Sequence, residues 1–484
     1  MNDPLNRYLL AIRNQVATTL RPDALGEVAQ KNSLYIERVL NYLAVVNRDL
    51  PQLTQSSRVA YRALLPELSV VLDDEPALTD ALKTHLADDG DPALAAATIQ
   101  SAAALLQKNP RPAATALVQA IGKIEMDLQQ RFVDALAKES RPVVMQADAN
   151  EGLSDAQKQS LTTMLRKRYP SDSALDIGKI KAIPGGFSKQ TIFLELLNTK
   201  SLPGNVVLRI DKPNSPVETT VVNEYEIIEA MHAAGVPIPQ PLLLEADTSI
   251  LGSAFVLVGR VDGVVAGDAF EVTDPCRSFG TTLAQGLAKM HNVPLDKVSG
   301  NVPGMKIHVQ QRMLGDIDYY ESKWRATQIP SLTLEIAYGW LRANIASSSG
   351  GRRAIVHRDV GCHNLLVKDG KLAAILDWET ALVGDPAQDI GYVVHTIEQI
   401  MPWEDFLAAY EAAGGKRPTQ AHINFYRVWR HVWLMTMQTQ ARAAIEAGYT
   451  DDIGLIYNVL NLFQRLSVSL QTLLCETGMV SAQT

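Results

Sequence analysis

Four polar residues stand at fixed spacing in the stretch VHRDVGCHNLLVKDGKLAAILDWE. His357 and Asp359 are two positions apart, Asn364 follows five positions later, and Asp377 comes after two short apolar runs. The Asp-Gly pair between these runs predicts a hairpin with a two-residue turn. Such a hairpin would return Asp377 to the same sheet edge as Asn364, so two loops with polar side chains are expected to converge.

The chemistry predicted for this cluster is metal-assisted transfer to a hydroxyl group. Mg²⁺ prefers oxygen ligands and is usually held by one or two carboxylates together with substrate phosphates. We therefore predict that Asn364 and Asp377 bind the metal and that Glu379 reaches it through water. Asp359 is not needed for the metal and is placed to accept a proton from a hydroxyl nucleophile. His357 completes the predicted catalytic pair, where it orients the loop rather than moving protons.

The motif HRDVGCHN, followed by ILDWE and GDPAQDIG, resembles the aminoglycoside phosphotransferase superfamily of small-molecule kinases. The resemblance covers about residues 178–480 and implies a protein-kinase-like fold, ATP as phosphoryl donor and Mg²⁺ as metal. The family usually has Gly where Arg358 stands, whereas protein kinases also have Arg there. Asp385 and Asp389 are predicted to be structural, with Asp389 capping a helix or bracing the catalytic loop.

A glycine-containing loop upstream is predicted to cover the nucleotide. The stretch IPGGFSKQT resembles the GGxSNxT loop of the family, with Lys189 in place of the usual Asn. Gly185 and Gly186 permit backbone conformations and a close phosphate approach that side chains would block. Ser188 and Thr191 are candidate nucleotide-loop residues.

The strands after this loop are predicted to hold the rest of the nucleotide. In VVLRID, Arg209 stands where kinases hold the lysine that binds the α- and β-phosphates, and Glu224 would be its helix partner. Arginine at this position is a feature in which the chain resembles the kinase domain fused to certain acyl-CoA dehydrogenases. The guanidinium group is permanently charged and can bind phosphate with two N–H groups at once. The run FVLVGRVDG is predicted to be the interlobe hinge, where the backbone from Val258 to Arg260 would meet adenine.

The secondary-structure elements that must position these residues differ in type along the chain. Residues 1–138 show helical periodicity cut by prolines, which predicts a helical bundle. Residues 139–155 have the composition of a linker. Residues 156–262 predict a nucleotide-binding lobe of five strands and one helix, and residues 263–484 a mostly helical lobe with the acceptor site. The predicted fold class is α+β, a bilobal protein-kinase-like fold with an additional all-α N-terminal domain.

Composition excludes several function classes. The 484 residues carry a net charge of −8, which argues against nucleic acid or an anionic membrane as partner. The three cysteines are far apart, giving neither a disulfide framework nor a CxxC metal site. The chain shows no basic, apolar leader and no run of membrane-spanning length, so we expect a cytoplasmic protein.

The acceptor is predicted less directly. Two segments expected to line its groove mix aromatic and basic side chains, which favours an anionic metabolite. The basic residues are Arg312, Lys323, Arg325, Arg427, Arg430 and Arg442. The resemblance implies a hydroxyacyl-CoA or hydroxy acid, because the acyl-CoA-dehydrogenase-associated kinases phosphorylate hydroxyacyl-CoA. A kinase of a cationic alcohol, such as an aminoglycoside or choline, and a catalytically silent nucleotide-binding regulator are the alternatives. For the N-terminal helices, homo-oligomerisation, a lid and partner docking all stay open.

Overall fold

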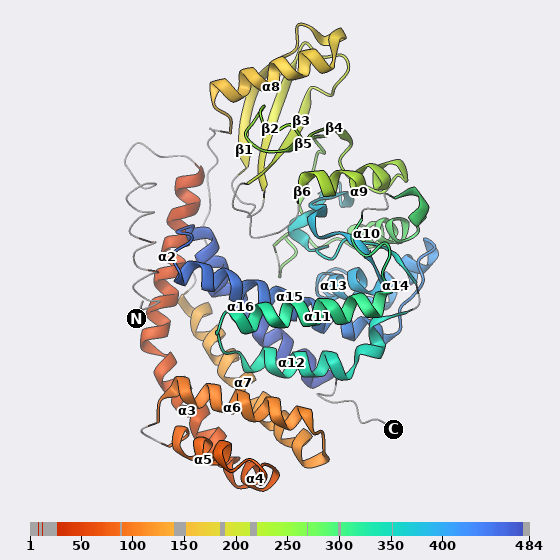
Figure 1. Ribbon diagram of the computed structural model, residues 1–484. Helices are drawn as coiled ribbons and strands as arrows, with labels where there is room; N and C mark the ends of the chain where they lie inside the picture. Colours follow the sequence, from red (N-terminus) through yellow and green to blue (C-terminus); the bar gives the residue numbers. More distant parts are fainter. Residues whose placement is uncertain are drawn as a thin grey trace. The chain divides into compact units, whose positions relative to one another are not determined.

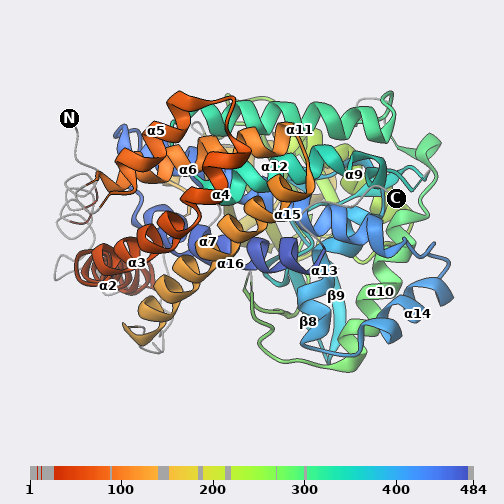
Figure 2. The same cartoon turned by 90° about the horizontal axis from the view of Figure 1, so that it is seen from below.

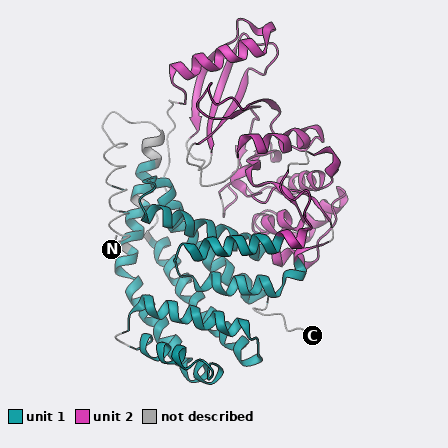
Figure 3. Cartoon of the chain, viewed as in Figure 1, with its two compact units in different colours: residues 1–147, 313–347, 427–484 teal, residues 148–312, 348–426 magenta. Residues whose placement is uncertain are grey.

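The computed structural model (Figure 1) divides into two compact units (Figure 3). Unit 1 comprises residues 1–147, 313–347 and 427–484, and unit 2 comprises residues 148–312 and 348–426. The structure describes residues 8, 12, 27–87, 90–139, 152–183, 189–212, 220–268, 270–298, 302–350 and 352–477. No helix within these ranges has the length and apolarity needed to cross a membrane.

Unit 1 is built from helices throughout its described residues. They are α2 (Glu27–Arg48), α3 (Leu50–Ala63), α4 (Leu65–Val71), α5 (Pro76–His85), α6 (Pro92–Lys108), α7 (Pro112–Glu139), most of α11 (Val309–Ala326), α12 (Leu332–Ala343), most of α15 (Gln420–Glu446) and α16 (Ile453–Glu476). Proline opens α5, α6 and α7, where its missing N–H would have had no partner within the helix. The all-helical N-terminal region confirms the prediction from its periodicity.

The two units divide the chain differently from the predicted domains. Segments 313–347 and 427–484 belong with the N-terminal helices, whereas the sequence assigned them to the C-terminal lobe. The physical reason is apolar packing between helices far apart in the sequence. Val39 of α2 lies in one core cluster with Ile456 and Val459 of α16, and α16 also lies alongside α7 (Figure 2).

A five-stranded antiparallel sheet opens unit 2. Its strands are β1 (Asp176–Ile183), β2 (Lys189–Leu197), β3 (Asn205–Asp211), β4 (Pro241–Glu245) and β5 (Phe255–Gly259), in the order β1-β2-β3-β5-β4. Helix α8 (Asp155–Arg168) begins with a capping box and lies across one face (Figure 1). There Leu161 and Leu165 pack against Leu194 and Leu208. Residues 156–262, predicted as five strands and one helix, contain these five strands and two helices, α8 and α9 (Val221–Ala233).

The remainder of unit 2 carries the catalytic motif. Its elements are β6 (Val264–Val265), α10 (Arg277–His291), β7 (Ala354–Val356), β8 (Leu365–Lys368), β9 (Lys371–Ile375), β10 (Leu382–Gly384), α13 (Ala387–Glu398) and α14 (Trp403–Ala412), with short 3₁₀ turns at Pro170–Asp172, Leu295–Lys297, Cys362–Asn364 and Trp378–Thr380. The turn between β8 and β9 consists of Asp369 and Gly370, with φ of 51° and 68°. These positive angles confirm the tight hairpin that the Asp-Gly pair predicts.

Candidate active site

The sheet face opposite α8 presents the candidate nucleotide-binding side chains. Side chains alternate along a strand, so residues opposite each other in register share a face. Thr191, Arg209 and Val256 form one such row across β2, β3 and β5. None of the three belongs to the core cluster under α8. The predicted residues Thr191 and Arg209 therefore lie side by side, whereas Gly185, Gly186 and Ser188 lie outside the described residues.

The predicted pair of Arg209 and Glu224 is present. One guanidinium nitrogen of Arg209 lies 3.2 Å from Oε2 of Glu224, and the other lies 2.6 Å from Oδ1 of Asp377. Glu224, in the first turn of α9, is only 1% exposed. Burial would lower the pKa of Arg209, but the charges of Glu224 and Asp377 raise it above its ordinary value. Arg209 therefore joins the helix to the loop that follows β9.

Lys189, at the start of β2, also lies in this group. Its ammonium is 3.3 Å from Oδ1 of Asp211, 3.5 Å from Oε2 of Glu379 and 3.6 Å from Oε1 of Glu224. From the sequence, Lys189 is recognised only as a substitution for the usual Asn in the loop. Its strand position was the available signal, because Lys189 precedes Thr191 by two residues and so shares its face of the sheet.

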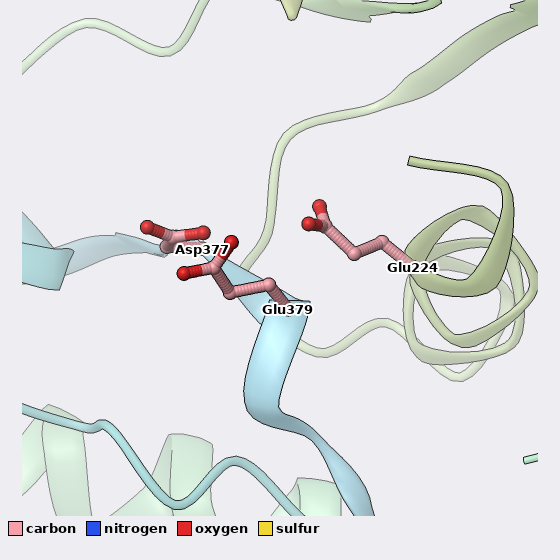
Figure 4. Close-up of side chains that lie close together, drawn as sticks. All are labelled: Glu224, Asp377 and Glu379. Carbon is pink, nitrogen blue, oxygen red and sulfur yellow. The ribbon is translucent and has the colours of Figure 1, made fainter. Parts of the chain in front are cut away.

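Three carboxylates converge at the centre of the site. Figure 4 shows Glu224 reaching from α9 towards Asp377 and Glu379, which follow β9. Each offers an oxygen, and these oxygens lie within 4.8 Å of one another. Asp377 has φ of 63°, in the left-handed region. Backbone strain of this kind at a non-glycine residue is typical of functional sites.

The electrostatics of this group suit a divalent cation. Four carboxylates face two cations, which leaves an excess of two negative charges when all four carboxylates are ionised. The members are Asp211, Glu224, Asp377, Glu379, Lys189 and Arg209. Burial, with the added charge of Asp377, raises the pKa of Glu224 to about 7 against the opposing effect of Arg209. Oε1 of Glu224 is buried and accepts no hydrogen bond within the described residues. Hard oxygen donors with uncompensated charge fit Mg²⁺.

Asn364 lies beside this group and contacts the catalytic loop. Its side-chain amide donates to the backbone oxygen of Asp359 at 2.9 Å and to Oδ2 of Asp359 at 3.0 Å. Its own backbone oxygen accepts from the N–H of Leu376 at 2.8 Å. The hairpin thus brings Asp377 next to Asn364, as its geometry requires, and links both to Asp359.

Asp359 is held by donors on both carboxylate oxygens. The hydroxyl of Tyr392, on α13, donates to Oδ1 at 2.5 Å, and Nε2 of His363 lies 3.5 Å from Oδ2. Burial would raise the pKa of Asp359, but the charge and hydrogen bond of His363, with the bond from Tyr392, lower it well below its usual range. Tyr392 and His363 were not among the residues predicted from the sequence. The signal for Tyr392 was its place one helical turn after Asp389.

His357 and Asp389 hold the catalytic loop in shape. Both ring nitrogens of His357 face backbone groups, the oxygen of Leu376 at 2.9 Å and the N–H of Asp359 at 3.2 Å. Asp389 accepts the N–H groups of His357 and Arg358 at 2.8 and 2.7 Å. His357 is fully buried and contacts the backbone of both Leu376 and Asp359.

The predicted hinge lies largely inside β5. Val258 pairs with Val207 of β3, the N–H of Gly259 donates to Gln240, and the N–H of Arg260 donates to the oxygen of Asn205. These two N–H groups are therefore engaged by the sheet itself. The guanidinium of Arg260 instead lies over the ring of Phe193, 4.7 Å from its centroid.

Two of the basic residues predicted to attract an anionic acceptor are neutralised within unit 1. Arg325 lies 2.6 Å from Glu335 and 3.0 Å from Glu321. Arg442 lies 2.7 Å from Glu446. These pairs remove part of the charge argument for an anionic acceptor.

Comparison with known proteins agrees with this geometry. Residues 179–426, just over half of the 484-residue chain, match the phosphotransferase enzyme family. The chain belongs to this family. The predicted resemblance to aminoglycoside phosphotransferases is confirmed, and with it the assignment as a phosphotransferase.

The individual relatives are distant. Acyl-CoA dehydrogenase family member 10 of Mus musculus is 29% identical over 43% of this chain and 19% of its own length. Family member 11 of Gallus gallus is 26% identical over 44% of this chain and 27% of its own length. This chain thus matches about a fifth to a quarter of these curated relatives. A protein of Ralstonia eutropha described as an aminoglycoside phosphotransferase shares the fold, with 19% identity, a TM-score of 0.50 and coverage of 65% of this chain and 98% of its own.

Proposed function

We propose that this phosphotransferase moves the γ-phosphoryl group of ATP to a hydroxyl group of a small molecule, with Mg²⁺ as the metal. The observation that carries the proposal is the contact set of Asp377. Its carboxylate meets Arg209, which is braced by Glu224. Asp377 also follows the β8–β9 hairpin, which begins directly after Asn364, the partner of Asp359. The residues that we propose for the phosphates, the metal and the acceptor thus adjoin one another.

At the phosphate end, Arg209 is the cation offered to the nucleotide. Its side chain is 14% exposed and is pinned by carboxylates on two sides, so it is positioned before any ligand binds. Such preorganised charge costs little reorganisation during reaction. Asp377, 35% exposed on its side chain, and Asn364 would hold Mg²⁺, which supplies neutralisation of phosphate charge.

At the acceptor end, Asp359 orients the hydroxyl and receives its proton. In the transfer, the acceptor oxygen forms a bond to the γ-phosphorus, the bond from that phosphorus to the bridging oxygen breaks, and ADP leaves. The lowered pKa of Asp359 makes it a weak base. Proton transfer therefore comes late, once bonding to phosphorus has acidified the hydroxyl, and Asp359 acts first by orientation.

For the acceptor we propose a hydroxyacyl-CoA or the related hydroxy acid. Support comes from the relatives, which are named as acyl-CoA dehydrogenase family members. A kinase that phosphorylates the hydroxyl of such a thioester would supply a good leaving group for later elimination.

The test is ATP consumption with and without Mg²⁺ across a panel of acceptors. The panel contains hydroxyacyl-CoAs, free hydroxy acids, aminoglycosides and choline. Asp359→Asn removes the proposed base, and Asp296→Asn, an exposed carboxylate in a 3₁₀ turn outside the site, is the matched control.

We expect turnover on a hydroxyacyl-CoA that requires Mg²⁺, is lost in Asp359→Asn and persists in Asp296→Asn. Turnover on an aminoglycoside or choline alone would refute the acceptor class and keep the kinase. Tight ATP binding without turnover on any acceptor would favour the regulator instead.

A further inference from the structure

Lys189 is a buried cation whose surroundings are anionic on three sides. Its side chain is 2% exposed, and its ammonium lies 3.3 to 3.6 Å from oxygens of Asp211, Glu379 and Glu224. These carboxylates come from the end of β3, from α9 and from the turn after β9. A lysine is almost never this buried unless carboxylates compensate its charge.

The geometry resembles a cation held in an anionic cage more than a single ion pair. The three distances are nearly equal, and each exceeds the 2.7 to 2.9 Å of a strong charge-assisted hydrogen bond. By contrast, Arg209 approaches Asp377 to 2.6 Å. The ammonium therefore neutralises several carboxylates together.

Burial separates the role of Lys189 from that of Arg209. Both side chains contact carboxylates, but Arg209 has five N–H donors and is 14% exposed, so it can also present N–H groups to a nucleotide. Lys189, at 2%, has its ammonium directed at carboxylates. Its charge thus acts on the protein's own acidic residues.

Charge balance shows what this does to the metal site. When all four carboxylates are ionised, they carry an excess of two negative charges over Lys189 and Arg209, which is the charge of one divalent cation. Without Lys189 the excess would be three. Glu379, which is 15% exposed, already lies against Lys189, whereas Asp377 is 35% exposed.

We propose that the ammonium of Lys189 takes the place of a second divalent cation, so that the site binds one metal ion per chain, at Asp377. This inference rests on the proposed function only in that the ion is the one accompanying the nucleotide. It also revises the predicted role of Glu379, which serves as the partner of Lys189 rather than as a metal ligand.

The experiment is a Mn²⁺ titration followed by electron paramagnetic resonance, which reports bound ions without turnover. It compares the wild-type chain with Lys189→Met, with and without a non-hydrolysable ATP analogue. Lys179→Met is the matched control, because Lys179 lies on neighbouring β1 and is exposed. Lys189→Arg keeps the positive charge and tests whether charge, rather than the lysine side chain itself, matters.

We expect one Mn²⁺ per nucleotide-loaded wild-type chain and two per Lys189→Met chain. Without nucleotide, Lys189→Met should bind Mn²⁺ about tenfold more tightly than wild type, because a nearby positive charge is gone. Lys179→Met and Lys189→Arg should match the wild type.

Two Mn²⁺ ions on the loaded wild type would overturn the proposal, even if Lys189→Met does not fold. Unchanged stoichiometry and affinity in a folded Lys189→Met would also overturn it. If the chain binds no ATP analogue at all, the proposed function fails, and the nucleotide-free affinities still decide the role of Lys189.

Discussion

Tyr392 donates its hydroxyl hydrogen to Oδ1 of Asp359 over 2.5 Å, although the two residues are 33 positions apart. The bond fixes one carboxylate oxygen, while Asn364 engages the other. Two fixed oxygens define the plane of the carboxylate, so Tyr392 is a positioning residue for the proposed base.

Tyr392→Phe removes this bond and leaves the ring. A hydrogen bond to a charged group contributes about 1.5–3 kcal/mol, so we expect kcat to fall about 10- to 100-fold. The KM for ATP should stay unchanged, because Tyr392 contacts the acceptor side. Steady-state kinetics beside Tyr225→Phe, a tyrosine of α9 outside these contacts, check this. A rise in the KM for ATP as large as the fall in kcat would contradict the assignment of Tyr392 as a positioning residue for Asp359.

Arg358 carries backbone strain that glycine would relieve. Its φ is 72°, a region that costs a non-glycine residue about 1–2 kcal/mol. Arg358→Ala and Arg358→Gly both remove the side chain, so their difference isolates the backbone. We expect the Gly variant to be more stable than the Ala variant by about 1 kcal/mol in urea unfolding. Equal stabilities would show that the loop relaxes away from this conformation.

The local parts of this structure are the ones that the sequence predicts well. The tight turn of the hairpin is specified by Asp369 and Gly370, and the catalytic spacing spans few residues. The strand pattern of FVLVG also identifies β5. However, it does not show where the chain leaves the sheet, because that depends on the partners of Gly259 and Arg260.

Contacts between distant segments were not predictable in the same way. Lys189 meets Glu379, 190 positions later, and neither residue belongs to a motif that specifies the other. The grouping of α16 with α2 likewise depends on how apolar faces pack, and periodicity shows only that such faces exist. The balance between the cations and carboxylates of the site therefore could not be predicted before the fold was known.

Asp172 makes the stability of unit 2 sensitive to acid. Its buried carboxylate accepts the N–H groups of Lys200 and Ser201, both at 2.9 Å, and the hydroxyl of Thr199 at 3.1 Å. Burial alone would raise the pKa of Asp172, but these hydrogen bonds outweigh it and lower the pKa. A folded-state pKa below the unfolded value means that the stabilisation is complete above about pH 4 and is lost as pH falls through the folded pKa.

Asp172→Asn should therefore lower the thermal midpoint by the same amount at every pH from about 5 to 8, where Asp172 is ionised in both states. The gap to the wild type should narrow below about pH 4. Thermal melts at pH 7, 5 and 3.5 measure it. If the difference in thermal midpoint between wild type and Asp172→Asn grew as pH fell, the pKa of Asp172 would be raised rather than lowered. The folded state would then stabilise the neutral carboxyl.

Arg209 should not tolerate replacement by lysine. Its fork spans Glu224 and Asp377 at once, with contacts of 3.2 and 2.6 Å, and a single ammonium does not reproduce this planar geometry. We expect Arg209→Lys to lower kcat/KM for ATP about tenfold and Arg209→Ala about 100-fold, as for the loss of a preorganised charge. Arg277→Lys, in an exposed pair with Asp405, is the control and should leave kcat/KM unchanged. If Arg209→Lys retains full activity, a point charge suffices at this position, and the simultaneous contact of the guanidinium with Glu224 and Asp377 is not required.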